Sequence, residues 1–249
     1  MKDENKLLLA KVNDILRLSG EKNCPKFSGF LSLEEQSIIV PLTQGVKAHL
    51  FGGYGDAERK MLGAMPDYIT EPYDAFPITA VRFSYPKEYS LSHRDVLGSL
   101  MALGIKRESV GDICFAKGLV TVFVTREIAS YITEQITKIG RVGVKAELLV
   151  PSVAASEFEA PVTQSVTFTV ASPRIDAVLS ALTGYSRAKA EQVIKDGLVF
   201  VNSLSVTKPT KQVAVNDKIT LRGTGKFVIT GSGNYSKKGR EIITAEKYL

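Results

Sequence analysis

The last third of the chain contains the stretch that decides the fold, PRIDAVLSALTGYSRAKAEQVIKDGLVFV, residues 173–201. Apolar side chains recur in it at spacings of three and four, as Ile175, Val178, Leu179 and Leu182 and then as Ala190, Val193 and Ile194. Such spacing places each set on one face of a helix. Gly184 follows the first set, and Gly197 follows the second. Glycine commonly ends helices, so the stretch predicts two short helices in a tight hairpin, the second capped by Ser186.

Short apolar runs follow the hairpin and predict a small β-sheet. The predicted strands are Leu198–Val201, Ser205–Thr207, Gln212–Val215 and Ile219–Arg222. A helix pair with one apolar stripe needs such a sheet to bury that stripe. We therefore predict that residues 173–249 form a domain in which a two-helix hairpin packs on a small β-sheet with a β extension.

The charge of the chain is concentrated in this predicted domain. The 249 residues contain 32 Lys and Arg against 26 Asp and Glu, net +6. Residues 173–249 hold 13 basic and 6 acidic side chains, net +7, and residues 1–172 hold 19 and 20, net −1. A basic module on a near-neutral body predicts a polyanionic partner, either nucleic acid or an anionic membrane surface.

Several cations are predicted to lie on or beside the second helix of the hairpin. They are Arg187, Lys189, Lys195, Lys208, Lys211 and Arg222. The first N–H groups of that helix also attract anions, because the helix dipole is positive there. This face therefore has the composition of a phosphate-binding surface.

Residues 174–223 resemble the S4 domain, an RNA-binding module. The resemblance is carried by Arg174-Ile175-Asp176, Leu179, Ser186-Arg187, Ala190, Ile194, Gly197, Val199, Val201-Asn202, Lys208-Pro209, Val213, Asp217, Ile219 and Arg222-Gly223. Ser203 and Asn216 stand where the family usually has glycine, and both residue types are tolerated in turns. The resemblance implies that RNA is contacted by Arg174, Ser186, Arg187, Lys189, Lys208 and Arg222.

Residues 77–150 show a second arrangement, in the order β-α-β-β-α-β. The predicted elements are a strand Ile78–Tyr85, a helix Ser92–Leu103, strands Asp112–Ala116 and Leu119–Thr125, a helix over Ile128, Ile132, Ile136 and Ile139, and a strand Val142–Val150. This order is typical of the ferredoxin-like fold, which RNA-recognition motifs share. Leu119 and Thr121 occupy positions where those motifs have stacking aromatics, so base stacking on this sheet is not expected.

The same region resembles the YlmH family through His93-Arg94-Asp95, Leu97-Gly98, Leu100, Leu103-Gly104-Ile105, Arg107 and Gly111-Asp112-Ile113. Members carry this domain ahead of a C-terminal S4 domain. The resemblance implies binding to ribosomal RNA, a role with the large ribosomal subunit in stalled-translation rescue, and a cell-division gene neighbourhood. A second set of candidate RNA contacts comprises His93, Arg94, Lys106 and Arg107 here and Lys237 and Lys238 near the C-terminus.

The remaining segments are less distinctive. Residues 1–76 are predicted to be a mixed α+β domain, with a helix around Leu8–Leu16, another from Ser32, and strands Val46–Phe51 and Met61–Met65 joined by a glycine-rich turn. Residues 151–172 are rich in Ser, Thr and Ala and are predicted to be a linker or an added strand, because Val166–Val170 alternates. The whole chain is therefore assigned to the α+β class.

Other functional classes receive little support from the sequence. Cys24 and Cys114 are the only cysteines and are not spaced as a zinc site or a disulfide framework, so we expect no metal site and no cofactor. No apolar run approaches the roughly 18 residues of a membrane span, and the N-terminus does not resemble a signal peptide. We expect a cytoplasmic protein without membrane insertion.

The leading hypothesis is a non-catalytic RNA-binding protein that docks on structured RNA, ribosomal RNA or tRNA on a ribosomal subunit, through the basic module. One alternative is an RNA-modifying enzyme of the pseudouridine synthase or methyltransferase class. Its usual order places the S4 module before a larger catalytic domain, whereas here the module comes last. Another alternative is an adaptor, linked to cell division, that binds a protein partner through residues 1–76. The target RNA and the oligomeric state stay open.

Overall fold

The computed structural model describes residues 3–156, 163–202 and 204–248. Contacts between Cα atoms divide the chain into two compact units, Met1–Glu159 and Ala160–Leu249. The fold is α+β, as predicted. Because one unit spans residues 1–76 and 77–150 together, the division into separate domains at residue 76 stays a prediction. Within the described residues, no helix is long and apolar enough to cross a membrane.

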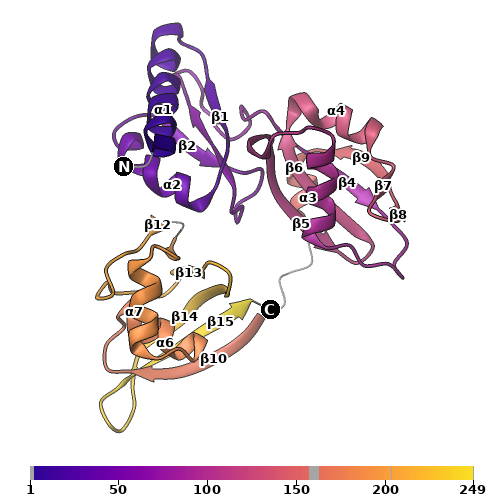
Figure 1. The fold of residues 1–249 in the computed structure, drawn as a ribbon. Helices are drawn as coiled ribbons and strands as arrows, with labels where there is room; N and C mark the ends of the chain where they lie inside the picture. Colours follow the sequence, from indigo (N-terminus) through magenta and orange to yellow (C-terminus); the bar gives the residue numbers. More distant parts are fainter. Residues whose placement is uncertain (1–2, 157–162, 203, 249) are drawn as a thin grey trace. The chain divides into compact units, whose positions relative to one another are not determined.

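The first unit begins with helices against a three-stranded antiparallel sheet of order β1-β3-β2 (Figure 1). Its elements are α1 (Asp3–Lys22), β1 (Lys26–Leu31), α2 (Leu33–Ile39), the 3-10 helix η1 (Val40–Thr43), β2 (Ala48–Phe51) and β3 (Lys60–Ala64). Val12 of α1 is buried against Leu31, Ile39 and Leu62. Ser32 caps α2 in a capping box with Glu35, as the sequence indicated.

Strand β1 is absent from the sequence predictions. The pattern KFSGFL does not alternate, and its register with β3 shifts between Phe27 and Phe30. Gly29 lies in this irregular part, where a Cβ would come within 2.8 Å of the backbone oxygen of Glu108. Glycine inside a strand often marks such a close backbone approach, which conceals the strand from periodicity.

The middle of the chain forms a four-stranded antiparallel sheet of order β5-β6-β4-β9, with α3 and α4 on one face (Figure 1). Its elements are β4 (Ile78–Ser84), α3 (His93–Ala102), the 3-10 helix η2 (Arg107–Ser109), β5 (Val110–Ala116), β6 (Leu119–Thr125), α4 (Arg126–Gln135) and β9 (Lys145–Leu149). This order and pairing are consistent with the predicted ferredoxin-like βαββαβ arrangement.

The predicted helix through Ile139 and the predicted strand from Val142 are both wrong in their bounds. Helix α4 ends at Gln135, and Ile139 belongs to a small hairpin of β7 (Lys138–Ile139) and β8 (Val142–Gly143). Gly140 in the turn has φ 59°, as a tight two-residue hairpin requires. Ile139 and Val142 are both buried and anchor this hairpin. The position of Ile139 fits a helical spacing only by coincidence.

The face of the four-stranded sheet opposite α3 and α4 is covered by other parts of the same unit. Ile78, Ala80 and Phe123 share a buried cluster with Phe30, and the ring of Tyr54 stacks on Phe123 at 4.9 Å between centroids. The cluster also includes Ala154 of helix α5 (Pro151–Ser156), which lies where the sequence predicted linker or strand. The N-terminal segment and the middle region therefore share one core.

Asp112 holds the two parts of this unit together with hydrogen bonds. Its carboxylate accepts from the Tyr54 hydroxyl at 2.8 Å and from the backbone N–H groups of Glu58 and Arg59 at 2.7 and 2.9 Å. Arg59 donates in turn to the carbonyl oxygens of Val110 and Phe30. Burial, followed by the nearby charge of Asp112, raises the pKa of Tyr54 above its usual range, and burial lowers that of Arg59.

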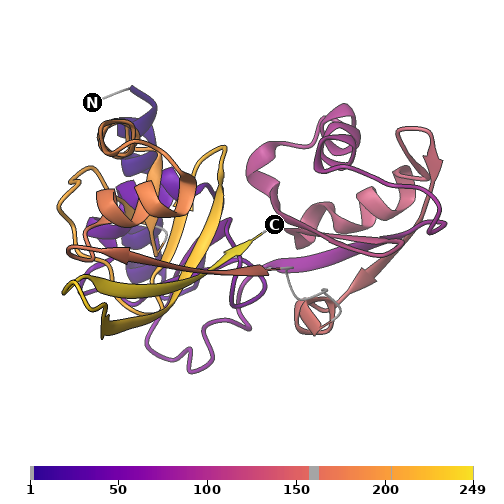
Figure 2. The ribbon, with the colours of Figure 1, turned by 90° about the horizontal axis from the view of Figure 1, so that it is seen from below.

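The second unit is a six-stranded antiparallel sheet of order β10-β15-β14-β13-β11-β12 with helices α6 and α7 packed on it (Figure 2). Its strands are β10 (Thr163–Val170), β11 (Val199–Val201), β12 (Leu204–Ser205), β13 (Lys218–Leu221), β14 (Gly225–Tyr235) and β15 (Glu241–Tyr248). The added-strand reading of Val166–Val170 is confirmed, because β10 pairs with β15 over its whole length. The predicted strand Gln212–Val215 is wrong: only an isolated bridge joins Gln212 to Arg174.

Tyr54→Phe tests the Asp112 contact, because it keeps the ring on Phe123 but removes the hydroxyl donor. We expect the free energy of unfolding at pH 7 to fall by about 2 kcal/mol, the usual size for a hydrogen bond to a charged group. The raised pKa of Tyr54 belongs to the folded state, so the unfolded chain releases this proton first, near pH 10. The wild type should therefore lose stability relative to the variant as the pH rises above about 10.

Urea unfolding followed by circular dichroism at pH 7 and at about pH 10.5 measures both effects. Comparing the two proteins at each pH cancels the other titrating groups. A difference in stability that stays constant between the two pH values would contradict the assignment of this proton to Tyr54.

Candidate nucleic-acid interface

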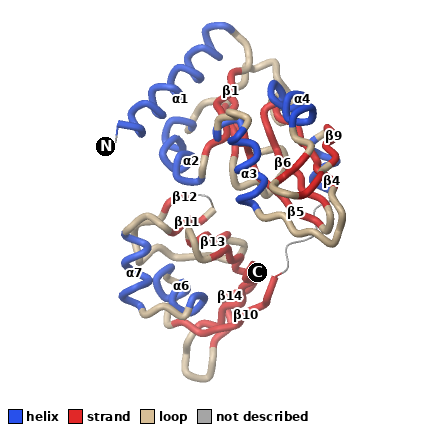
Figure 3. The backbone as a smooth tube through the Cα atoms, turned by 45° about the vertical axis from the view of Figure 1, so that its right-hand side comes forward, coloured by secondary structure: helices blue, strands red, loops and turns tan. Residues whose placement is uncertain are grey.

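The helix hairpin of the second unit forms as the sequence predicted. Helix α6 (Ile175–Thr183) ends at Gly184, whose φ of 72° is left-handed, and α7 (Arg187–Lys195) begins after Ser186. The Ser186 hydroxyl accepts from the backbone N–H of Lys189 at 3.2 Å. Both apolar stripes enter one core with strands β11, β13, β14 and β15. Figure 3 shows the two helices beside β11, β13 and β14.

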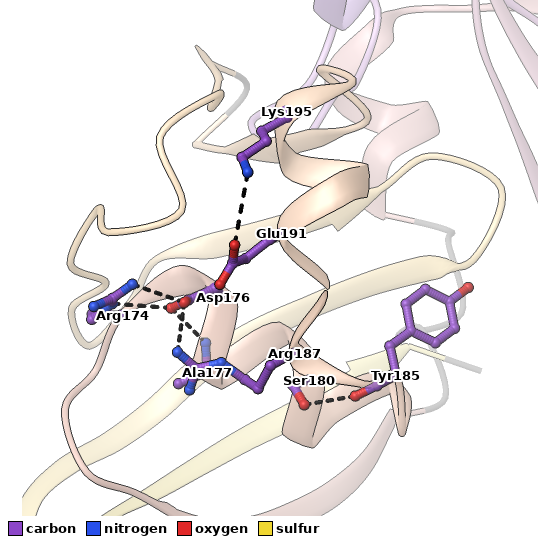
Figure 4. Close-up of polar contacts among 8 residues, drawn as sticks. All are labelled: Arg174, Asp176, Ala177, Ser180, Tyr185, Arg187, Glu191 and Lys195. Atoms are coloured by element: carbon purple, nitrogen blue, oxygen red, sulfur yellow. Dashed lines mark hydrogen bonds and ion pairs between the residues drawn. The ribbon is translucent and has the colours of Figure 1, made fainter. Parts of the chain in front are cut away.

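A buried carboxylate at the start of α6 joins two of the predicted RNA contacts. The side chain of Asp176 has 0% exposure, yet it accepts hydrogen bonds from Arg174 at 2.9 and 3.2 Å and from Arg187 at 2.5 Å (Figure 4). Its Oδ1 also accepts from the backbone N–H of Ala177 at 2.8 Å. A buried charge is tolerated only when it is paired and hydrogen-bonded in this way.

This arrangement fixes the direction of two guanidinium groups. The side chain of Arg174 is 35% exposed and that of Arg187 is 51% exposed, so each retains donors that face solvent. An Arg guanidinium has five N–H donors, and the bonds to Asp176 use only some of them. The remaining donors are held in place for a further planar or tetrahedral acceptor, such as a phosphate.

The turn Lys208–Lys211 lies against the same end of α6. The N–H of Ile175 donates to the carbonyl oxygen of Lys211 at 2.8 Å. The N–H of Lys211 in turn donates to the carbonyl oxygen of Lys208 at 3.1 Å, which closes the turn. Lys208 and Lys211 are both exposed. The structure therefore brings four predicted residues around the start of α6, which we call the α6 basic cluster: Arg174, Arg187, Lys208 and Lys211.

The other predicted residues of this unit are placed separately. The Lys189 ammonium lies 3.8 Å from the centroid of the Tyr185 ring, a cation–π contact. Lys195 is 3.8 Å from Glu191 on the exposed side of α7 (Figure 4). Arg222 follows β13, and its N–H donates to the carbonyl of Leu198 beyond the end of α7. These residues extend the basic surface along α7 but do not join the cluster.

The second set of candidate contacts is dispersed. His93, Arg94 and Lys106 are exposed, whereas Arg107 is half-buried and donates to the carbonyl of Val110 at 2.5 Å. Burial lowers the pKa of His93, and the neighbouring Arg107 lowers it further. Lys237 and Lys238 are exposed in the turn between β14 and β15. Arg107 is thus engaged by the backbone, and the others face solvent.

Two residues that organise the site received no role from the sequence. Asp176 was noted only as part of the Arg174-Ile175-Asp176 motif, and an acid in a first helical turn is equally typical of any helix N-terminus. Tyr185 lies in the hairpin turn, where an aromatic ring has no periodicity to reveal its partner. Among the residues that the structure describes, no group of three or more His, Cys, Asp and Glu side chains is placed to hold a metal ion.

Comparisons with known proteins agree with these features. The model described as "Putative RNA-binding domain in YlmH" matches residues 72–150, and that of the S4 domain matches residues 173–219. A Bacillus subtilis relative, named ribosome-associated protein quality control protein P2, is 33% identical over 236 residues, covering 93% of this chain and 90% of its own length.

A solved structure, titled cell division protein ylmH from Streptococcus pneumoniae, superimposes with a TM-score of 0.54 at 20% identity. It covers 64% of this chain and 97% of its own, and at that identity the likeness concerns the fold alone. The two family models match in the expected order, and the Bacillus subtilis relative is similar over nearly the full length. The chain therefore belongs to the YlmH family of S4-domain proteins.

Proposed function

We propose that this protein is a non-catalytic RNA-binding protein whose second unit docks on folded RNA through the α6 basic cluster. The observation that carries the proposal is the pair of guanidinium groups held by the buried carboxylate of Asp176. Phosphate contacts from fixed cations position a protein on an RNA backbone without reading its sequence. Rigid donors suit this task better than flexible lysines alone, because less freedom is lost on binding.

The surroundings of the cluster support RNA over a lipid surface. A membrane-binding surface normally combines cations with exposed apolar side chains that enter the lipid. Around the start of α6, the apolar residues Ile175, Val178 and Val213 are buried instead. The exposed atoms of the cluster belong to charged groups, which favours a hydrophilic polyanion with discrete phosphates.

The relative named for ribosome-associated quality control supports the ribosome as the location of that RNA. We propose ribosomal RNA as the principal partner, with tRNA as a further candidate, and stalled-translation rescue on the large subunit as the process. A cytoplasmic location follows from this proposal. An enzymatic role predicts modified nucleotides, which mass spectrometry of RNA incubated with the protein and S-adenosylmethionine would detect.

Lys208→Gln combined with Lys211→Gln tests the cluster without disturbing Asp176. We expect binding to ribosomal RNA extracted from large subunits to weaken about tenfold at 150 mM KCl. The slope of log K against log salt should become shallower by roughly 1.5, since each lost phosphate contact contributes about 0.7 to 0.9. Filter binding between 50 and 300 mM KCl measures both quantities.

The matched control is Lys11→Gln with Lys22→Gln, which removes two exposed lysines from α1. It changes the net charge equally, so non-specific attraction falls equally in the two variants. If both variants bind like the wild type, or if both weaken to the same extent, the cluster is not the RNA-binding site.

Asp176→Asn separates orientation from charge. We expect the free energy of unfolding to fall by about 2 kcal/mol, because two guanidinium groups lose their shared anion but can turn toward water. We also expect RNA binding to weaken several-fold although the protein becomes more positive. Asp196→Asn, an exposed acid after α7, makes the same charge change and should leave binding equal or slightly stronger. Stronger binding by Asp176→Asn would show that charge alone matters.

A further inference from the structure

We propose that the first unit carries a second RNA-binding surface, at the end of its four-stranded sheet where β4 and β5 finish and β6 and β9 begin. This inference deepens the proposed function and rests on it. Five exposed cations lie in the loops and strand starts at this end, and we call them the basic end: Lys87, Lys117, Lys138, Arg141 and Lys145. None of them belongs to the sets that the sequence singled out.

Strand register places these residues at one end. Ser84, the last residue of β4, pairs with Leu119 of β6 and with Lys145 of β9, and Leu119 also pairs with Ala116 of β5. The β5–β6 turn, which contains Lys117, and the segment after β4, which contains Lys87, therefore meet there. The N–H of Tyr85 donates to the carbonyl of Gly118 at 2.9 Å, which joins the two segments directly.

The hairpin of β7 and β8 supplies the rest of the basic end and is well anchored. It precedes β9 directly, and the N–H of Val144 donates to the carbonyl of Thr137 at 2.9 Å to close its base. Ile139 and Val142 are buried, whereas Lys138 and Arg141 are exposed. Figure 1 shows β7 and β8 next to β4 and β9. A short hairpin with a two-residue turn presents its cations with little freedom to lose on binding.

The charge of this end is strongly biased. From Thr137 to Lys145 the chain has three cations and no acid, and none of the three forms an ion pair with a described residue. Acids on the neighbouring segments are Glu88 after β4, Asp95 in the first turn of α3 and Glu134 in the last turn of α4, while Glu147 of β9 pairs with Arg82. The five cations of the basic end outnumber the three acids that have no such pairing with Arg82. Exposed cations such as Lys138, Arg141 and Lys145 attract phosphates, and binding releases the counterions of the nucleic acid.

The usual alternative surface of such a sheet is closed in this chain. RNA-recognition motifs bind bases on the face opposite their helices. Here Tyr54 stacks on Phe123 of that face, and a Cβ on Gly53 would come within 2.5 Å of the same ring, so no base can enter. The match to an RNA-binding domain at residues 72–150 therefore needs another surface, and the basic end fits the phosphate backbone of folded RNA.

Lys138→Gln combined with Arg141→Gln in the full chain tests this surface, with Lys11→Gln and Lys22→Gln as the matched control. The probe is ribosomal RNA extracted from large subunits. We expect binding to weaken about tenfold at 150 mM KCl and the salt slope to become shallower by roughly 1.5, with an unchanged thermal melt. Binding equal to that of the control would overturn the inference.

The Lys208→Gln and Lys211→Gln variant, measured in parallel, separates this inference from the proposed function. If only that variant weakens, the proposed function stands and the second surface is rejected. If neither variant weakens, both are rejected. The last arm measures binding to vesicles of phosphatidylcholine and phosphatidylglycerol. If the Lys138→Gln and Arg141→Gln variant loses affinity for these vesicles but not for RNA, the basic end binds lipid and the inference is overturned.

Discussion

A carboxylate that is fully removed from water must be compensated by fixed positive charge, and this constraint organises the second unit. Asp176 has 0% exposure and is bonded to Arg174, Arg187 and the N–H of Ala177. Arg174 precedes α6, and Arg187 begins α7. The two ion pairs with Asp176 therefore fix the start of one helix relative to the start of the other. The helix hairpin is thereby fixed at the point where Arg174 and Arg187 reach solvent, which links the stability of the unit to the geometry of the α6 basic cluster.

The first unit solves a related problem with Asp112, which accepts three hydrogen bonds from the segment Tyr54–Arg59. The face of the four-stranded sheet opposite α3 and α4 is apolar in this chain, with Ile78, Ala80 and Phe123 in a buried cluster. The N-terminal segment covers that face, and the bonds to Asp112 fix its register. The consequence is that the face on which RNA-recognition motifs bind bases is covered here by Tyr54 and the N-terminal segment.

The spacing of apolar residues predicted the elements that pack through one regular face. The stripes of α6 and α7, the capping box of Ser32 and the pairing of β2 with β3 could all be deduced, because each depends on residues close in the chain. It did not predict β1, α5 or the true end of α4. Each of these depends on a tertiary contact: Gly29 against Glu108, Ala154 against the sheet, and Ile139 buried from a hairpin. Ile139 follows Ile136 by three residues, which fits a helix, and this spacing does not show which element buries the side chain.

The candidate site was foreseeable in composition but not in arrangement. Counting charges located the basic unit, and the motif named Arg174 and Arg187 as contacts, yet neither method could show that both share one buried anion. That sharing changes how the cations work. A lysine such as Lys208 carries its charge on a flexible side chain, whereas the two arginines held by Asp176 present donors in a fixed direction. Binding therefore costs less side-chain entropy at the arginines than at the lysine. A surface built from both can attract a phosphate backbone broadly and still select its local geometry, which is the combination that docking on folded RNA demands.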